Sequence, residues 1–546
     1  MIAILLLLLP GPAGAQDSSG ARLRREDFEA LLAAATGPGQ LEELHRECAR
    51  AGLEGEKKKV EEILSRLKLP ARPAGDFARR AQLRAARAQA RRVVDGFLAS
   101  RGREAAGQVR KIASWMRAQG YGPPSARDRL RDLARRLMAE PAEAVPLLRE
   151  IDALPAGEGT SALSREFEDR LAELVRDLAD RLLAAVDKCL AANEPGLAFD
   201  LFQYLLKIDP ENARARKSLG QVRIRDRWLR PYEVQQFKNG FVWDPRWGWV
   251  VERERARYEA GEYFDLEARR WASLDALDRE HSDPANPWRL KSEHFDLAST
   301  AGLELSVKVL ARLEAFFLQA FGEYDLFFAR GSSGTGAKLI FGVAPVEKRL
   351  AVTFYRDARQ FKEHAKPPTE WAAGFYSGGG RGSFFHAFEG KMSVGVLQHE
   401  LTHQILGEFS AGRAPSWLSE GAAVWLEDAE FRDGVLAVGW PARPRRVAEY
   451  RANLRAGKKE HPFREVIRFG NGRGWDEGDV SANYRGAGAA VAFFLHFDGG
   501  RYRGDFIDLL RDSYQGVARP VEDYFGLSID SLDFLMDRFY RECILR

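Results

Sequence analysis

Two histidines one helical turn apart are the residues of this chain best suited to chemistry. His399 and His403 flank Glu400 in the pattern H-E-x-x-H, inside a run over 394–406 that predicts a helix. Positions i and i+4 of a helix share one face, so both imidazoles can bind one metal ion. Glu400 then lies beside the open position of that ion, where a carboxylate can accept a proton from bound water. The pattern predicts zinc with a general base; the alternative for the motif alone is two surface histidines.

A glutamate further along the chain is the natural third ligand. Catalytic zinc usually takes three protein ligands and keeps one position for water. Glu420 follows His403 within a second expected helix, and the small residues at 421–423 permit this helix to pack closely against the first. On its own, Glu420 would be a surface carboxylate. Together with H-E-x-x-H it completes a set of two histidines and one glutamate, which predicts one Zn²⁺ per chain.

Three segments of the C-terminal half resemble the gluzincin zinc metallopeptidases, a peptidase MA-like group that includes thermolysin and aminopeptidase N. Two are the zinc-binding segments, and the third begins a later helix rich in small residues. The resemblance implies a zincin-type α+β metallopeptidase domain over 288–546 and does not extend to the N-terminal half. The matching segments are His399-Glu400-Leu401-Thr402-His403, Leu418-Ser419-Glu420-Gly421-Ala422-Ala423 and Asn483-Tyr484-Arg485-Gly486-Ala487-Gly488-Ala489-Ala490-Val491.

The resemblance also implies a role for each of five side chains. His399, His403 and Glu420 are the expected zinc ligands, and Glu400 is the expected catalytic base. Tyr484, at the start of the small-residue helix, is expected to stabilise the oxyanion that forms during hydrolysis. Only one local pattern supports the role of Tyr484, so the alternative for this residue is a core or surface tyrosine.

Two departures from the gluzincin pattern limit what carries over. Some gluzincins have an acid one turn after the third ligand, which orients a zinc histidine. Here that position is Val424, and the nearest acids are Glu427 and Asp428. The Gly-Ala-Met-Glu-Asn signature with which aminopeptidases recognise a peptide N-terminus is missing, and the segment 374–378 stands in its place. We therefore expect an endopeptidase rather than an exopeptidase.

The remaining motifs carry little chemistry. His386 precedes the zinc helix on an expected strand and is a second candidate for the cleft. The glycines at 378–380 lack the Lys-Ser/Thr of a phosphate-binding loop, and no G-x-S-x-G segment occurs. Four other histidines have no partner at ligand spacing and are expected to be structural or surface residues: His294, His364, His461 and His496.

Composition divides the chain into regions. The region 16–225 is rich in Ala, Leu, Arg and Glu, the residues that favour helices. Within it, 176–220 resembles a tetratricopeptide repeat, with Ala198 expected at a helix crossing and Pro210 at the repeat boundary. Because only one such unit stands out, we expect a helical-repeat-like region. The segment 226–287 is rich in tryptophan and glycine and is expected to be a small linking element.

The C-terminal part alternates two kinds of periodicity. Strands are expected at 294–299, 350–355 and 383–388, a helix at 303–321, and long helices from 394 onward. Strands followed by helices describe an α+β domain. The expected fold is therefore an all-α region followed by an α+β domain.

Composition and charge exclude several classes of protein. The chain has 546 residues, a net charge of +4 and three cysteines spaced far apart. Nucleic acid is therefore not an expected partner, and neither a disulfide framework nor a thiolate zinc site is expected. Residues 1–15 combine an apolar run with a small-x-small site, as in a secretory signal peptide, although no basic residue precedes the run. The alternatives for this segment are a misassigned start and an uncleaved end.

These observations favour an exported zinc endopeptidase, periplasmic or secreted, without a membrane span after signal cleavage. Its substrate would be a protein or peptide, and the helical region could recruit a protein partner. One alternative is a catalytically weak zincin-fold scaffold that binds proteins through the helical region. Another is a zinc hydrolase that cleaves a different bond.

Overall fold

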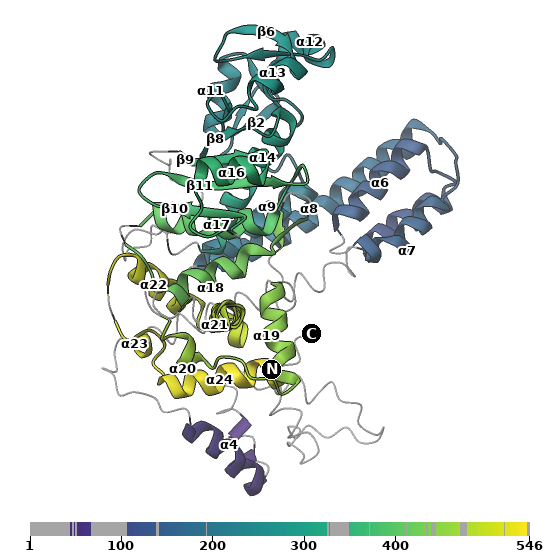
Figure 1. Cartoon of the computed structure of the whole chain (residues 1–546). Helices are drawn as coiled ribbons and strands as arrows, with labels where there is room; N and C mark the ends of the chain where they lie inside the picture. The colour runs from purple at the N-terminus through teal and green to yellow at the C-terminus, as the bar shows by residue number, and fades with distance from the viewer. Residues whose placement is uncertain are drawn as a thin grey trace, which may run out of the picture.

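The computed structural model of the chain combines helices and sheet (Figure 1). Across the described residues, no helix has both the length and the apolar character needed to cross a bilayer. The segment 1–15, expected to be a signal peptide, lies outside the described residues. These are 44–66, 106–327 and 349–542, with short gaps at 46–47, 50–51, 138–140, 193, 325–326, 371, 411, 433–434, 438–443, 470–474, 476–477 and 518.

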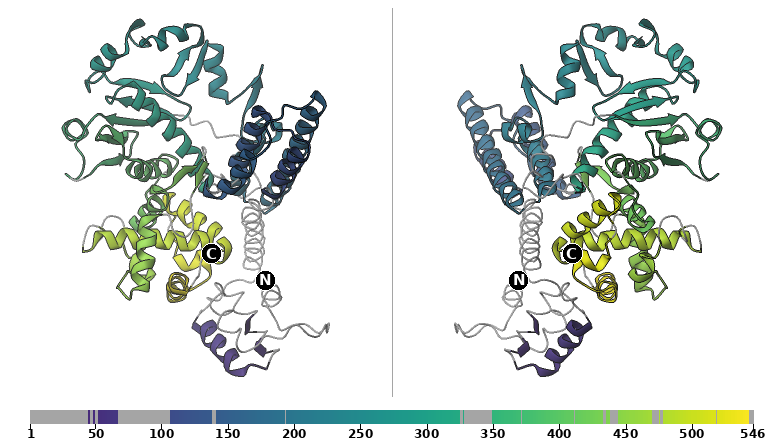
Figure 2. Two further views of the ribbon diagram at one scale, coloured as in Figure 1. Left: turned by 90° about the vertical axis from the view of Figure 1, so that its right-hand side faces the viewer. Right: turned by 90° about the vertical axis from the view of Figure 1, so that its left-hand side faces the viewer.

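The N-terminal part is helical, as the composition predicts. Helices α6 and α7 project from the body as an arm, and α8 and α9 form a hairpin at its base (Figures 1 and 2). Ala198 is fully buried in this hairpin, which matches the expected helix crossing. The third helix of the unit is only six residues long, so the likeness to a tetratricopeptide repeat is limited to one hairpin. The bounds are α4 (Glu54–Arg66), α6 (Pro124–Leu137), α7 (Pro141–Asp152), α8 (Ser161–Ala191), α9 (Pro195–Ile208) and α10 (Ala213–Ser218).

The tryptophan-rich segment consists of three two-stranded hairpins and short helices. Its aromatic side chains form a small core around Trp247, Tyr258 and Tyr263, which continues onto Leu303 and Val307 of the next long helix. The segment is therefore packed against the C-terminal part. Its elements are β1 (Val222–Ile224), β2 (Arg227–Leu229), α11 (Pro231–Lys238), β3 (Phe241–Asp244), β4 (Gly248–Val251), α12 (Arg255–Glu259), β5 (Glu262–Asp265), β6 (Arg270–Ser273) and α13 (Leu274–Glu280).

A mixed sheet forms the first layer of the C-terminal part. Its strand order is β10-β11-β9-β8-β7, with β8, β9 and β11 parallel and the two outer strands antiparallel. The three expected strands are confirmed, and helices α14 and α16 supply the crossovers that parallel strands require. The outer strands β7 and β10 are too short to show a pattern. The bounds are β7 (Trp288–Lys291), β8 (Phe295–Ser299), α14 (Leu303–Glu323), β9 (Leu350–Tyr355), α16 (Ala358–Ala365), β10 (Gly374–Ser377), β11 (Gly382–Phe388) and β12 (Lys391–Met392).

One glycine explains how β11 enters the sheet beside β9. Gly382 has a φ of 89°, and a Cβ built on it would lie 2.0 Å from the carbonyl oxygen of Ala351. Any other residue would therefore clash with the neighbouring backbone. This glycine permits the close approach that brings β10 and β11 to the edge facing the zinc-motif helix.

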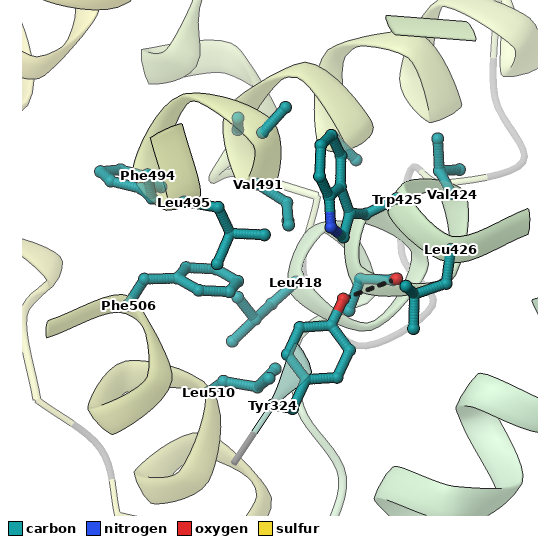
Figure 3. Close-up of a cluster of buried hydrophobic side chains, with 14 of the residues drawn as sticks. Tyr324, Leu418, Val424, Trp425, Leu426, Val491, Phe494, Leu495, Phe506 and Leu510 are labelled. Atoms are coloured by element: carbon teal, nitrogen blue, oxygen red, sulfur yellow. Dashed lines mark hydrogen bonds between the residues drawn. The ribbon is translucent and has the colours of Figure 1, made fainter. Parts of the chain in front are cut away.

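Helices from residue 394 onward form the second layer. Helix α18 lies between α17 and α21 and shares a large hydrophobic core with them. In this core, shown in Figure 3, the hydroxyl of Tyr324 donates a 2.9 Å hydrogen bond to the carbonyl of Ala422. The bounds are α17 (Val394–Glu408), α18 (Ser416–Glu427), β13 (Glu430–Arg432), β14 (Val435–Ala437), α19 (Arg445–Arg455), α20 (Phe463–Val466), α21 (Val480–Gly500), α22 (Arg503–Tyr514), α23 (Val521–Phe525) and α24 (Ile529–Glu542).

Helix α18 packs on α17, as expected, but Gly421, the first small residue after Glu420, serves a contact with α21. A Cβ on Gly421 would lie 2.6 Å from the carbonyl oxygen of Ala487 and 2.7 Å from a methyl group of Val491, both in α21. Gly421 therefore permits close packing of α18 on α21, not on the zinc-motif helix α17. This packing brings the start of α21 toward the motif.

Candidate metal centre

The two motif histidines and Glu420 converge on one point between α17 and α18. The Nε2 atom of His399 lies 3.1 Å from Oε2 of Glu420, and Nε2 of His403 lies 3.3 Å from the same oxygen. The two Nε2 atoms are 3.3 Å apart. The three atoms therefore form a nearly equilateral triangle, and their side chains are largely buried.

This triangle matches the ligand spacing of a tetrahedral zinc ion. Zinc bonds to histidine nitrogen and carboxylate oxygen are about 2.0–2.2 Å long, so two ligands of a tetrahedron lie roughly 3.3–3.5 Å apart. The residues present thus fit the metal in type, number and spacing. Among the described residues no fourth His, Cys, Asp or Glu joins this group, which leaves one corner of a tetrahedron without a protein ligand.

A carboxylate orients His399 from behind. Nδ1 of His399 donates a 3.0 Å hydrogen bond to Oε2 of Glu427, the last residue of α18. Glu427 is also paired with Arg446, at 3.2 Å. Val424 stands where some gluzincins have the orienting acid. Its side chain packs against α21, where a Cβ on Gly488 would lie 2.4 Å from it. The orienting acid is therefore present one turn later than the gluzincin pattern suggests.

A hydroxyl pair supports His403 in the same way. Nδ1 of His403 lies 3.1 Å from Oγ of Ser419, which in turn lies 3.1 Å from the hydroxyl of Tyr514 in α22. Burial raises the pKa of Tyr514 to about 12, so the phenol keeps its proton at neutral pH. If Nδ1 of His403 donates to Ser419, the lone pair of Nε2 is directed at the triangle.

Electrostatics make the triangle a site for positive charge. Burial on its own lowers the pKa of His399, but the hydrogen bonds to Glu420 and Glu427 outweigh it and raise the pKa to about 10. Burial on its own raises the pKa of Glu420, whereas His403 and His399 together hold that pKa well below its usual range. A metal cation must therefore displace a proton from His399, and acid should weaken its binding.

Glu400 lies on the same helix but makes a different contact. Its Oε2 accepts a 3.0 Å hydrogen bond from the backbone N–H of Tyr376, in the edge strand β10. Burial raises the pKa of Glu400, although the two motif histidines lower it. A carboxylate whose pKa is raised toward neutrality is better suited to take up and return a proton.

Tyr484 stands over the histidine pair from the first turns of α21. The centroid of its ring lies 6.0 Å from that of His399, and the guanidinium of Arg446 lies 4.5 Å above the Tyr484 ring. Burial, and next the charge of Glu420, raise the pKa of Tyr484 above its ordinary value. The phenol therefore keeps a proton that it can donate.

His386, the second candidate for the cleft, lies elsewhere. Alternate residues of β11 face opposite sides of the sheet. Phe385 belongs to the core that contains α17, whereas His386 lies 5.1 Å from the ring of Phe361 in α16. Its side chain is thus on the face away from the triangle, and it is not part of the site.

The other four histidines are structural, but two of them have partners that were not expected. His364 stacks on Tyr355, and His496 packs on Trp425. His294 does have a partner, contrary to the sequence analysis, because its Nδ1 lies 2.8 Å from Oε2 of Glu314. This contact joins β8 to α14, so spacing along the chain could not reveal it. His461 also has a partner, because its Nδ1 lies 3.0 Å from Oε2 of Glu465, which stands four residues later in the sequence.

Sequence reasoning missed the residues that hold the site from outside. Tyr376, Ser419, Arg446 and Tyr514 have no motif of their own, although the position of Ser419 next to Glu420 was a usable signal.

A comparison with protein-family models and a search of curated proteins both find no match for this chain.

Proposed function

We propose that the chain is a zinc-dependent endopeptidase. One observation carries this proposal: Nε2 of His399, Nε2 of His403 and Oε2 of Glu420 form a triangle of 3.1–3.3 Å edges, with Glu400 on the same helix. A structural zinc site needs four protein ligands and no base. Three ligands beside a carboxylate with a raised pKa support hydrolysis instead.

The side chains divide the work of peptide hydrolysis. The chemistry that zinc supplies in such a site is Lewis acidity, which lowers the pKa of water toward 7 and polarises a carbonyl. Glu400 takes the proton of the attacking water and returns it to the leaving amine. Tyr484 donates a hydrogen bond from its phenol to the negative charge that develops on the carbonyl oxygen. This interaction is present only in the transition state.

The edge of the sheet supports a peptide as substrate. Among the described strands, β10 pairs only with β11, so no described strand occupies its other edge, where an extended chain could pair. The N–H of Tyr376 in this strand holds Glu400, which ties the edge to the base. A peptide paired along β10 would pass the base with chain on both sides, which favours cleavage within a chain.

We extend the proposal to export and to partner binding. Export rests on the segment 1–15. Protein binding rests on the arm of α6 and α7 together with the α8–α9 hairpin at its base. Neither depends on the chemistry of the triangle. Each can therefore fail without the other, and without the hydrolytic mechanism.

The decisive experiment compares zinc content and cleavage in one set of full-length variants. Wild type should cleave a mixed peptide library, including peptides blocked at both ends, which only an endopeptidase can cut. Glu400→Gln should keep zinc and lose about 10²- to 10⁴-fold in rate, because it removes only the base. Glu420→Ala should lose the metal. Glu363→Gln, an exposed change in α16, is the control and should match wild type.

Two results would contradict the proposal. Cleavage by Glu400→Gln at the wild-type rate would exclude the mechanism. No cleavage by the zinc-loaded wild type would favour the scaffold, or a hydrolase acting on another bond.

A further inference from the structure

A second pocket lies far from the metal triangle along the chain, where three parts of the molecule meet. It has a volume of about 270 Å³. Gln203 of α9 lines one side, the tryptophan-rich segment contributes Trp243 and Trp249, and Glu314 and Gln319 come from α14. Helices α9 and α14 contact each other, and the tryptophan-rich segment lies above them in Figure 1. The pocket is small by the standard of sites for drug-sized ligands, so it suits a ligand about as large as one amino-acid residue.

The charges that line the pocket are mostly negative. Glu233, Glu293 and Glu314 contribute three carboxylates, and Arg230 is the one cation among the described residues that line the pocket. Arg230 Nη1 lies 3.1 Å from Glu293 Oε2 and 3.7 Å from Glu314 Oε2. One guanidinium thus faces three carboxylates, which leaves an excess of negative charge that disfavours an anionic ligand.

Polar groups in the pocket lack partners. Gln319 lines the pocket and is only 5% exposed. Nε1 of Trp249 is likewise buried without an acceptor within the described part of the chain. Oε2 of Glu293 makes no hydrogen bond to described residues and has only its ion pair with Arg230. Nη1 of Arg230, which faces Glu293 across that ion pair, is also buried without a hydrogen bond to described residues. Because buried polar groups are normally satisfied, the carboxylate of Glu293 has the capacity to accept from a further donor.

Aromatic rings form the remaining wall. Trp249 meets Tyr232 edge-on at 5.8 Å and Trp243 at 5.4 Å between centroids. The guanidinium of Arg349 lies 5.2 Å from the centre of the Tyr232 ring, so this wall already holds one cation by its π face. Trp243 is partly exposed and offers the entrance.

We propose that this pocket binds an organic cation, a guanidinium or ammonium group on a short apolar stem. The carboxylate of Glu293 receives the charged head, the amide of Gln319 accepts a further N–H, and Trp243 and Trp249 cover the stem. This site is independent of the proposed hydrolysis.

A metal ion is a poorer fit at the same residues. Glu293, His294 and Glu314 have ligand atoms close together. However, Nδ1 of His294 is engaged by Glu314, and the ring is stacked on Phe317. Arg230 already lies between the two carboxylates. A cation large enough to use the aromatic wall, rather than a bare ion, can donate to the carboxylate of Glu293 while its apolar stem lies against Trp243 and Trp249.

Calorimetric titration of the full-length chain tests the site with three matched probes. Nα-acetyl-L-arginine amide represents a basic residue of a peptide, agmatine represents a free cation, and Nα-acetyl-L-citrulline amide has the same shape as the first without charge. We expect the citrulline probe to bind about tenfold or more weakly than the arginine probe, because it loses a charged hydrogen bond. If agmatine also binds, free cations suffice; if only the arginine probe binds, the ligand is a peptide residue.

Two variants assign the binding to this pocket. Glu293→Gln should weaken the arginine probe about tenfold or more, and Trp243→Ala, at a partly exposed position, should weaken it as well. Glu267→Gln, an exposed change in the same tryptophan-rich segment, is the control and should bind as wild type. Equal affinity for the arginine and citrulline probes, no binding of either cation, or wild-type binding by both pocket variants would overturn the proposal.

Discussion

Glu427 and His399 lie on neighbouring helices, and the imidazole Nδ1–H donates to the carboxylate over 3.0 Å. An ionised carboxylate can only accept, so this bond keeps a proton on Nδ1, and the proton that a metal ion displaces is the one on Nε2. Arg446 holds Glu427 on its other side and also lies over the Tyr484 ring. One arginine thus links the orienting carboxylate to the expected oxyanion donor.

Replacing Glu427 should weaken metal binding without removing a ligand. We expect Glu427→Gln to lower zinc affinity by about 10- to 100-fold, because a neutral amide orients His399 less strongly. Competition with a chelating dye measures the affinity. Glu449→Gln, at an exposed site on α19, is the control. Unchanged affinity in Glu427→Gln would show that the hydrogen bond has no positioning role.

Removing one hydroxyl tests the oxyanion donor. Tyr484→Phe keeps the ring against His399 and Arg446, so zinc content and KM should remain near wild type. We expect kcat on the reporter peptide to fall about 10²- to 10³-fold, the usual cost of a lost oxyanion donor. The control is Tyr540→Phe, because the buried hydroxyl of Tyr540 in α24 donates to the carbonyl of Ala489, which lies in α21 with Tyr484. This variant should leave kcat unchanged. Equal rates for the two variants would make Tyr484 a packing residue.

The contact between α18 and α21 should tolerate no added volume. In Gly421→Ala the new Cβ would meet the backbone of Ala487, so the helices must separate. We expect a loss of about 1–3 kcal/mol in the free energy of unfolding, together with weaker zinc binding. Gly395→Ala, where the nearest atom is 3.5 Å away, is the matched control and should be neutral or slightly stabilising. Similar denaturation midpoints for both variants would contradict this packing.

The buried pair of Glu314 and His294 should make stability depend on pH. Burial alone raises the pKa of Glu314, but His294 and Arg230 lower it below its ordinary value of 4.5. A depressed carboxyl pKa contributes stability that is whole above 4.5 and is lost as pH falls through the folded-state value. The stability gap between wild type and Glu314→Gln should therefore narrow on acidification. Urea unfolding from about pH 7 to about pH 3 measures it, and a constant gap would contradict the pair.

Local spacing explains which parts of the site could be predicted from sequence. His399 and His403 share one helix, so the period of the helix alone brings them together. Glu420 needed only a second helix nearby. The role of Glu427 depends on how α18 crosses α17, and the contact of His294 with Glu314 crosses from a strand to a helix. Such pairs are set by packing between elements, which no single-sequence period encodes.

The strands show the same division. The expected strands β8, β9 and β11 are five to seven residues long, whereas β7 and β10 are four-residue edge strands. The side of the sheet on which His386 lies follows from the pairing of β11 with β9, since a shift of one residue reverses it. Whether His386 faces the cleft can therefore be decided only once the pairing register of β11 and β9 is known.

The chain separation within the site has a consequence for the order of folding. His399 and Glu420 are 21 residues apart, so the metal ligands form a local helical pair that closes early. Tyr484 comes much later in the sequence and reaches the pair only when α21 docks on α18. Metal capture can therefore precede catalytic competence during folding. Conversely, undocking of α21 would abolish the proposed hydrolysis while leaving the proposed zinc ion bound, a state that zinc analysis alone would count as intact.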